Sequence, residues 1–194
     1  YEQALIAAEK AEQAAFLVGD DLQLTRALLN KSQAHHRLDS SDEALKEVQQ
    51  ALELSNRLED SETAVQCLRS LTLIAIDSGQ QAYVTHYVNL LQDLLNHLDA
   101  AKINLSAIGV GYIALGEINN RLGRYDKVAR PSLLAVRIFK KLDRQKLAAK
   151  ALYNLGESGR LRGDNEQAMP FYREALAIAA TIGDQHSEMF YRTE

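Results

Sequence analysis

A repeat of about 40 residues is the feature that most constrains how this chain can fold. The apolar residue that ends each predicted second helix recurs at steps of 40, 40, 44 and 40, as Val18, Leu58, Leu98, Leu142 and Ile182. Two columns of mostly small residues keep the same steps: Ala4, Ala44, Val84, Val128 and Ala168, and then Ala11, Ala51, Leu91, Ala135 and Ala175. Such self-similarity predicts a row of equivalent helix pairs, each of which buries its apolar side against its neighbours.

Three further columns fall before these helices, in the predicted first helix of each pair and in the turn. The bulky column is Leu28, Leu68, Tyr112 and Leu152, and the small column is Ser32, Thr72, Gly116 and Gly156. The turn column is Asp39, Gly79, Gly123 and Gly163. A glycine at the turn can take the left-handed backbone that ends a helix. Asp20 or Asp21, Asp60 and Asp164 are expected N-caps, and Ser40 with Glu43 is expected to form a capping box.

The clearest unit spans 151–184, where Leu152, Leu155, Gly156, Ala168, Tyr172 and Ala175 stand at the column positions. These residues resemble the tetratricopeptide repeat, whose first helix carries a large residue and then Leu-Gly, and whose second carries small, aromatic and small residues. The period exceeds the usual 34 and is similar to the longer variety found in kinesin light chains and bacterial signalling regulators. The resemblance implies an all-α fold, a right-handed α-solenoid of antiparallel helix hairpins.

The columns predict one array over residues 1–194. Residues 1–19 would be the second helix of a truncated repeat, and residues 185–194 the start of a further first helix. The four full pairs are expected at 21–58, 61–98, 101–142 and 145–182. Neither end has the polar face that terminal repeats need, so we expect a fragment of a longer protein, with a complete small protein as the alternative.

The third pair contains the one change of period, four residues inserted before Tyr112. Gly109 and Gly111 lie just before Tyr112, and each glycine inside a helix costs roughly 1 kcal/mol relative to alanine. Either the backbone needs a close approach there or the helix begins late, and the insertion is either a hinge or a packing adjustment. Pro131 and Pro170 lie within second helices, where we expect mild bends and not breaks.

Composition limits the functional classes. The chain has 194 residues and a formal net charge of -4, which argues against a nucleic-acid surface because such a surface needs a basic stripe. No run approaches the roughly 18 apolar residues of a membrane span, and no secretory leader is visible. The single cysteine excludes internal disulfides and fits a reducing compartment, so we expect a cytoplasmic protein.

Catalytic and metal-binding patterns are weak. Cys67 is expected to pack as a small hydrophobe, because no nearby base supports a nucleophile. His35 and Asp39 have an i,i+4 spacing that could chelate, but no third ligand is evident. We therefore expect no catalytic residue, cofactor or metal, and a catalytic domain is the weakest functional class.

The resemblance places the first helices on the concave side of the array, which implies that they line a binding groove. The candidate groove residues from the first two repeats are Arg26, Leu29, Asn30, Gln33, Arg37, Arg69, Leu73 and Ile76. Those from the last two are Val110, Ile113, Glu117, Asn120, Lys150, Tyr153, Asn154, Glu157 and Arg160. The middle of this set is apolar and its ends carry cations and amides. It is incomplete as the carboxylate clamp of chaperone-binding relatives, since Leu29 and Tyr153 stand where that clamp has lysine.

Two functions follow as hypotheses. In the first, the chain is an interaction module that holds a peptide or helix with an apolar centre and acidic character. In the second, it is a sensor, regulatory or oligomerisation segment of a bacterial signalling protein, such as a transcription activator or nucleotide cyclase. The apolar middle could instead pack against another domain of the same chain or a second copy. The expected partner is thus a protein or peptide, with no nucleic acid and no membrane.

Overall fold

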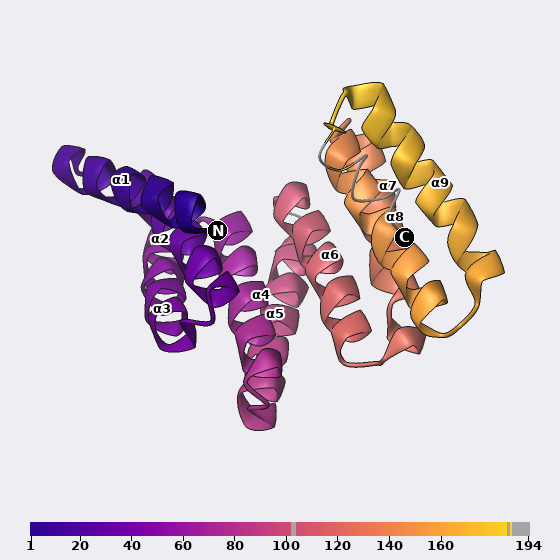
Figure 1. Ribbon diagram of the computed structural model, residues 1–194, viewed down its shortest axis with the longest axis horizontal. Coiled ribbons are helices and arrows are strands. Elements are labelled where there is room, and N and C mark those ends of the chain that lie inside the picture. Colours follow the sequence, from indigo (N-terminus) through magenta and orange to yellow (C-terminus); the bar gives the residue numbers. More distant parts are fainter. Residues whose placement is uncertain (102–103, 186, 188–194) are drawn as a thin grey trace. The chain divides into compact units, whose positions relative to one another are not determined.

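The computed structural model describes residues 1–101, 104–185 and 187, and these form an all-α fold (Figure 1). Most of the predicted further first helix, 185–194, lies outside the described residues. The described helices are α1 (Glu2–Val18), α2 (Asp21–Arg37), α3 (Ser41–Arg57), α4 (Ser61–Asp77), α5 (Gln81–Ala101), α6 (Leu105–Arg121), η1 (Tyr125–Lys127), α7 (Ala129–Lys141), α8 (Gln145–Leu161) and α9 (Asn165–Ile182). The predicted fold class, helices in antiparallel hairpins, is confirmed.

The chain divides into two compact units, which we call unit 1 (Tyr1–His97) and unit 2 (Leu98–Glu194). In unit 1, α2 packs on α1 and α3, and α3 packs on α4. In unit 2, α6 packs on α7 and α8, and α8 packs on α9. A single array over 1–194 stays a prediction.

The helix ends follow the expected chemistry with one exception. Asp20, Asp60 and Asp164 each accept a hydrogen bond from the backbone N–H three residues on, which satisfies an otherwise unpaired donor of the first turn. Ser40 is the N-cap of α3 but makes no such side-chain bond, so the predicted capping box is wrong. The turn residue Asp39 has φ 60° and Gly163 has φ 80°, the left-handed conformation expected at that column.

The change of period lengthens one helix. α5 has 21 residues where α3 has 17, and the extra four add about one turn. The hairpin predicted to end at Leu98 therefore runs to Ala101. α6 begins seven residues before Tyr112, as α2 does before Leu28, so it does not begin late. A Cβ on Gly109 would lie 2.6 Å from the Phe139 ring, which shows that this glycine permits a close approach of α6 and α7.

The two prolines behave differently. Pro170 lies inside α9, which is continuous from Asn165 to Ile182, as predicted. Around Pro131 the second helix is split, because η1 ends at Lys127 and α7 begins only at Ala129. Proline lacks the N–H that would bond the carbonyl four residues earlier, at Lys127. The expectation of an unbroken helix is thus wrong at Pro131.

Candidate functional site

The predicted groove residues of α2 form one exposed stripe. Arg26, Asn30, Gln33 and Arg37 follow at steps of four, three and four, so they fall within about 60° of the helix circumference. All four are exposed. The Arg37 guanidinium lies over the ring of Tyr1, 5.8 Å from the ring centroid. The stripe is therefore cationic and rich in amides, and it contains no carboxylate.

The remaining candidates of unit 1 are less accessible. Leu29 is only 4% exposed, so it belongs to the core. The prediction that Leu29 lines the groove is therefore wrong. Arg69, Leu73 and Ile76 of α4 are half-buried. Since α2 and α4 pack against each other, the polar stripe of α2 lies on a helix that adjoins a more apolar one.

In unit 2 the candidates divide between surface and interior. Lys150 and Arg160 are exposed, and those of intermediate burial are Val110, Glu117, Asn120, Tyr153 and Glu157. Ile113, 3% exposed, belongs to the core cluster with Phe139 and Leu152. Asn154 is 4% exposed. Burial of Ile113 and Asn154 corrects the prediction that they line a groove, because they have too little surface to meet a ligand.

The amide of Asn154 has an internal role. Its Nδ2 donates to the carbonyl oxygen of Ile113 at 2.9 Å, and Nδ2 of Asn120 donates to the carbonyl oxygen of Asn154 at 2.8 Å. These bonds join α6 to α8. Asn154, which we predicted to line the groove, instead helps to hold two first helices together.

Glu157 is also engaged within unit 2. Its carboxylate accepts hydrogen bonds from the Tyr172 hydroxyl and from Nε and Nη2 of Arg160, both at 2.9 Å. Partial burial acts to raise the Glu157 pKa, but these bonds outweigh it and hold the pKa below 4.5. Burial and the bond to Glu157 raise the pKa of Tyr172. Tyr153 packs against the Tyr172 ring with centroids 5.6 Å apart, so the cluster is a preformed, mainly structural feature.

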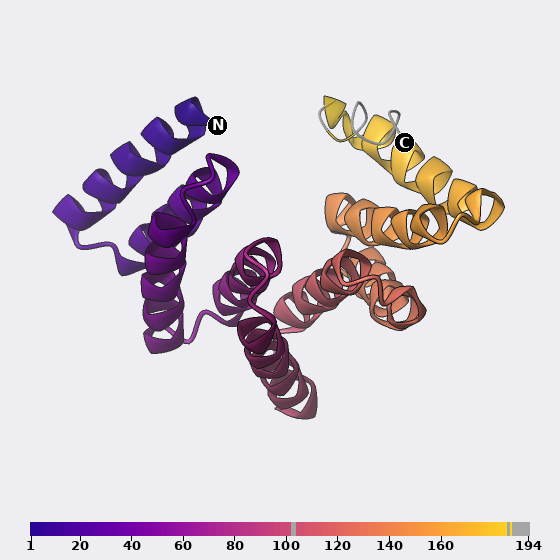
Figure 2. The ribbon, with the colours of Figure 1, turned by 60° about the horizontal axis from the view of Figure 1, so that its bottom comes forward.

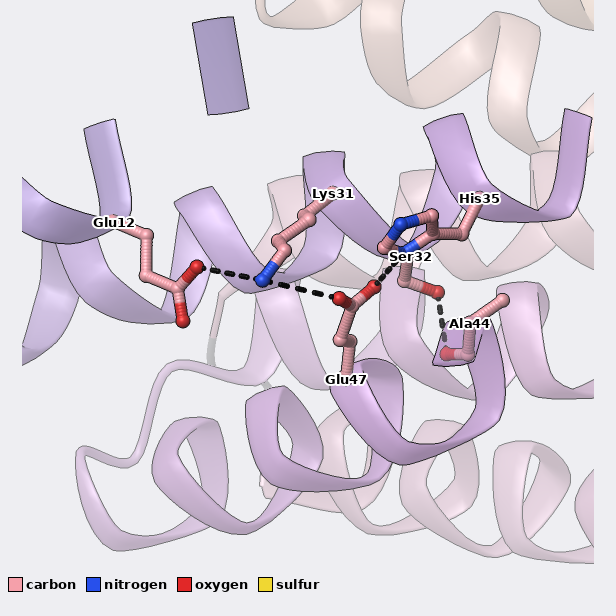
Figure 3. Close-up of polar contacts among 6 residues, drawn as sticks. All are labelled: Glu12, Lys31, Ser32, His35, Ala44 and Glu47. Carbon is pink, nitrogen blue, oxygen red and sulfur yellow. Dashed lines mark hydrogen bonds and ion pairs between the residues drawn. The ribbon is translucent and has the colours of Figure 1, made fainter. Parts of the chain in front are cut away.

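Sequence reasoning missed a charged network in unit 1 (Figure 3). Lys31 Nζ lies 2.9 Å from Glu12 Oε2 and 3.3 Å from Glu47 Oε1, and His35 Nδ1 lies 2.8 Å from Glu47 Oε2. The network joins α1, α2 and α3. The hydrogen bond to Glu12, supported by Glu47, raises the Lys31 pKa against the opposing effect of burial. Glu47 could have been found, since it lies between Ala44 and Ala51 on the buried face of its helix.

Cys67 and His35 can be placed directly. Cys67 is fully buried, and burial raises the pKa of its thiol to about 12, which suits a packed hydrophobe and not a nucleophile. His35 pairs with Glu47 and not with Asp39. Among the described residues, no group of three or more histidine, cysteine or acidic side chains is placed to hold a metal. Of the helices described, none is long and apolar enough to cross a bilayer.

Comparison with protein families supports the resemblance directly. A tetratricopeptide-repeat model matches residues 25–58 and 149–182, the segments of α2–α3 and α8–α9. Among curated protein sequences, none matches the chain.

Solved structures share the fold at low sequence identity. A Rap protein complexed with competence and sporulation factor has a TM-score of 0.75 at 20% identity, over 97% of this chain and 52% of the Rap chain. BtubC from P. vanneervenii has a TM-score of 0.67 at 16% identity, over 93% and 74%. A kinesin-light-chain-type protein from Podosopora anserina, with nearly identical TPR-like repeats, has a TM-score of 0.58 at 16% identity, over 94% and 90%. The chain thus spans about half the length of Rap.

Helix order, column residues and these matches define the class, a helical-repeat scaffold of the type used for protein interaction. The two matched segments, 25–58 and 149–182, are tetratricopeptide repeats.

Proposed function

We propose that this chain is a non-enzymatic interaction module that binds a peptide or helical segment of another protein along its first helices. One observation carries the proposal: the exposed stripe lies on α2, which packs against α4, the helix that carries the half-buried apolar residues. Arginines pair well with carboxylates through charge-assisted hydrogen bonds. The preferred ligand is therefore a segment with apolar side chains and an acidic edge.

The proposal narrows the candidate binding residues, in each unit taken by itself, to those that remain accessible. In unit 1 these are Arg26, Asn30, Gln33 and Arg37 on α2, with Arg69, Leu73 and Ile76 on α4. In unit 2, Lys150 and Arg160 are exposed, and we propose a secondary role for them because both already interact with other groups. Asn120, Glu117, Tyr153, Glu157 and Val110 are proposed as supporting residues.

A second function is favoured by the fold of Rap, which was crystallised with competence and sporulation factor. This chain would then be a cytoplasmic sensor or regulatory segment of a larger signalling protein. Another domain of the same chain or a second copy would be the partner in place of a separate protein.

Site-specific photo-crosslinking tests the proposal. A photoreactive amino acid replaces Gln33 in one variant and Lys46 in a control, since both are exposed and Lys46 lies on α3. A bound protein should crosslink at position 33 and not at position 46. Arg26→Glu should weaken capture of that protein several-fold, while Lys46→Glu, with the same charge change, should not. Equal crosslinking at the two positions, or equal capture by the two charge variants, would contradict the groove.

A further inference from the structure

Positive charge is concentrated on and around one second helix of unit 2. Residues 121–150 contain ten lysines and arginines and two aspartates, although the whole chain has a net charge of -4. α7, which lies within this segment, has no acidic residue. It packs against α6 and α8, in the pink-to-orange part of the ribbon in Figure 2. The charge therefore lies on a helix whose neighbours before and after it in the chain are both in place.

Three of these cations form a stripe on the outward side of α7. Arg130, Arg137 and Lys141 follow at steps of seven and four, so they fall within about 40° of the helix circumference. All three are exposed. The buried residues of α7, among them Ala135 and Phe139, lie on the opposite side of the helix. The stripe is thus not the face by which α7 packs on its neighbouring helices.

The stripe is not neutralised by the protein itself. Among the residues that the structure describes, none forms an ion pair with Arg130, Arg137 or Lys141. Glu174 of α9 reaches α7, but it pairs with Lys140 at 2.7 Å. An arginine side chain can bind a carboxylate through two parallel hydrogen bonds. The stripe therefore has the capacity to bind a negatively charged partner.

An apolar residue lies among the cations. Leu133 is 48% exposed and falls about 40° from Arg137 around the helix. In α3 the same repeat positions, 84 residues earlier, are occupied by Gln49 and Glu53, which are exposed, so the repeat itself requires neither leucine nor arginine there. A leucine gains nothing from a phosphate backbone, but an apolar side chain of a protein can bury it. The observations therefore favour a protein partner over a nucleic acid.

We propose that Arg130, Leu133, Arg137 and Lys141 form a second interaction surface, which binds an acidic amphipathic helix of another protein. The occupant places an apolar residue on Leu133 and carboxylates on the cations before and after it. Arg130 precedes Leu133 by three residues and Arg137 follows it by four, so the complementary helix carries acidic residues at these spacings on either side of a leucine. This surface goes beyond the proposed function, because it lies on a second helix and uses none of the groove residues.

The probe for the test is a fluorescein-labelled synthetic helix on an otherwise neutral background. It has one central leucine, with glutamate three positions before it and four positions after it. Its binding to the chain is measured by fluorescence anisotropy. We expect saturable binding that weakens as salt is added, because salt screens exposed charges. A probe with its glutamates moved to the opposite face should bind about tenfold more weakly.

Variants of the chain locate the binding. Arg130→Glu and Arg137→Glu should each weaken it about tenfold or more, because like charges would then face each other. Lys46→Glu makes the same charge change at the repeat position of Arg130 in α3 and should bind as wild type does. Leu133→Gln should weaken binding several-fold, and should have no further effect when the leucine of the probe is also replaced by glutamine. Arg26→Glu, which tests the groove, should leave this binding unchanged.

Four outcomes would overturn this surface. Two are absence of saturable probe binding and equal binding by Arg130→Glu and Lys46→Glu. The third is a labelled oligonucleotide that binds more tightly than the probe, loses affinity in Arg137→Glu and keeps it in Leu133→Gln, which would make a nucleic acid the partner. The fourth is a dimer in sedimentation that Arg137→Glu dissociates, which would make a second copy the occupant. The substituted side chains are exposed, so an unchanged unfolding midpoint verifies that each variant is folded.

Discussion

Unit 1 and unit 2 use the same repeat positions but hold their helices together with different chemistry. In unit 1, Lys31 of α2 lies between carboxylates of α1 and α3 (Figure 3). One of these carboxylates, Glu47, lies on the buried face of α3 with Ala44, Val48 and Ala51. In unit 2 the helices meet at glycines. A Cβ on Gly156 would lie 2.7 Å from the Tyr172 ring, and the side-chain amides of Asn120 and Asn154 join α6 to α8.

This difference predicts which substitutions each unit tolerates. Contacts made by charged side chains depend on protonation state and on the presence of every partner. Contacts made by glycine and alanine depend on volume, since a close-packed interior cannot absorb an added side chain. Unit 1 should therefore respond most to charge removal, and unit 2 most to added volume.

The largest expected effect is overpacking in unit 2. Ala175 is 0% exposed, so Ala175→Leu should lower the free energy of unfolding by about 1–3 kcal/mol. Ala11 occupies the same column in unit 1 but is exposed, so Ala11→Leu should change the free energy of unfolding by less than about 0.5 kcal/mol. Denaturant unfolding of both variants measures the comparison, and equal effects would show that the repeat register is wrong.

Removal of the lysine in unit 1 should have the next effect. In Lys31→Met, the Glu47 side chain, which is 9% exposed, loses its lysine partner and keeps the contact with His35. The substitution should therefore lower the free energy of unfolding by about 2 kcal/mol. Lys46→Met is the exposed control. Because the folded pKa of Lys31 is raised above 10.5, its stabilising contribution is present below that pH and is lost as pH rises through the folded value. The difference in free energy of unfolding between wild type and Lys31→Met should become smaller at alkaline pH. A difference that does not change with pH would contradict the network.

In unit 2 we expect a smaller pH dependence of stability, with the opposite sign. The folded pKa of Glu157 lies below 4.5, so its contribution is present above that pH and is lost as pH falls through the folded value. Glu157 is partly exposed, which limits the effect to below about 1 kcal/mol. Thermal unfolding between pH 3 and 6 should show a shallower acid dependence for Glu157→Gln than for wild type. Identical curves would remove Glu157 as a contributor.

The single thiol allows the units to be followed separately. Cys67 is buried in α4, so thiol labelling reports the opening of unit 1. Lys31→Met should raise the labelling rate several-fold, whereas Ala175→Leu should leave it nearly unchanged because Ala175 belongs to unit 2. Equal acceleration by the two variants would show that the units open together.

Much of the fold could be predicted because the signals are local. Helical periodicity, aspartate caps and left-handed turn residues act over three or four residues, and they place nearly every helix. Pro131 was harder, because Pro131 and Pro170 look alike in sequence and only one splits its helix. The candidate site was less predictable, since a repeat pattern shows which face a residue shares and not whether a neighbour covers it.

The columns of small and bulky residues by themselves determined that this chain forms tetratricopeptide-type hairpins, because one helical register buries most of the small and bulky positions together. The tertiary structure alone decided how equivalent positions are used. Asn30 and Asn154 occupy the same place in their helices, yet one is exposed and the other is bonded to the helix beside it. Burial and hydrogen bonding depend on neighbours far along the chain, and the identity of a residue does not contain that information.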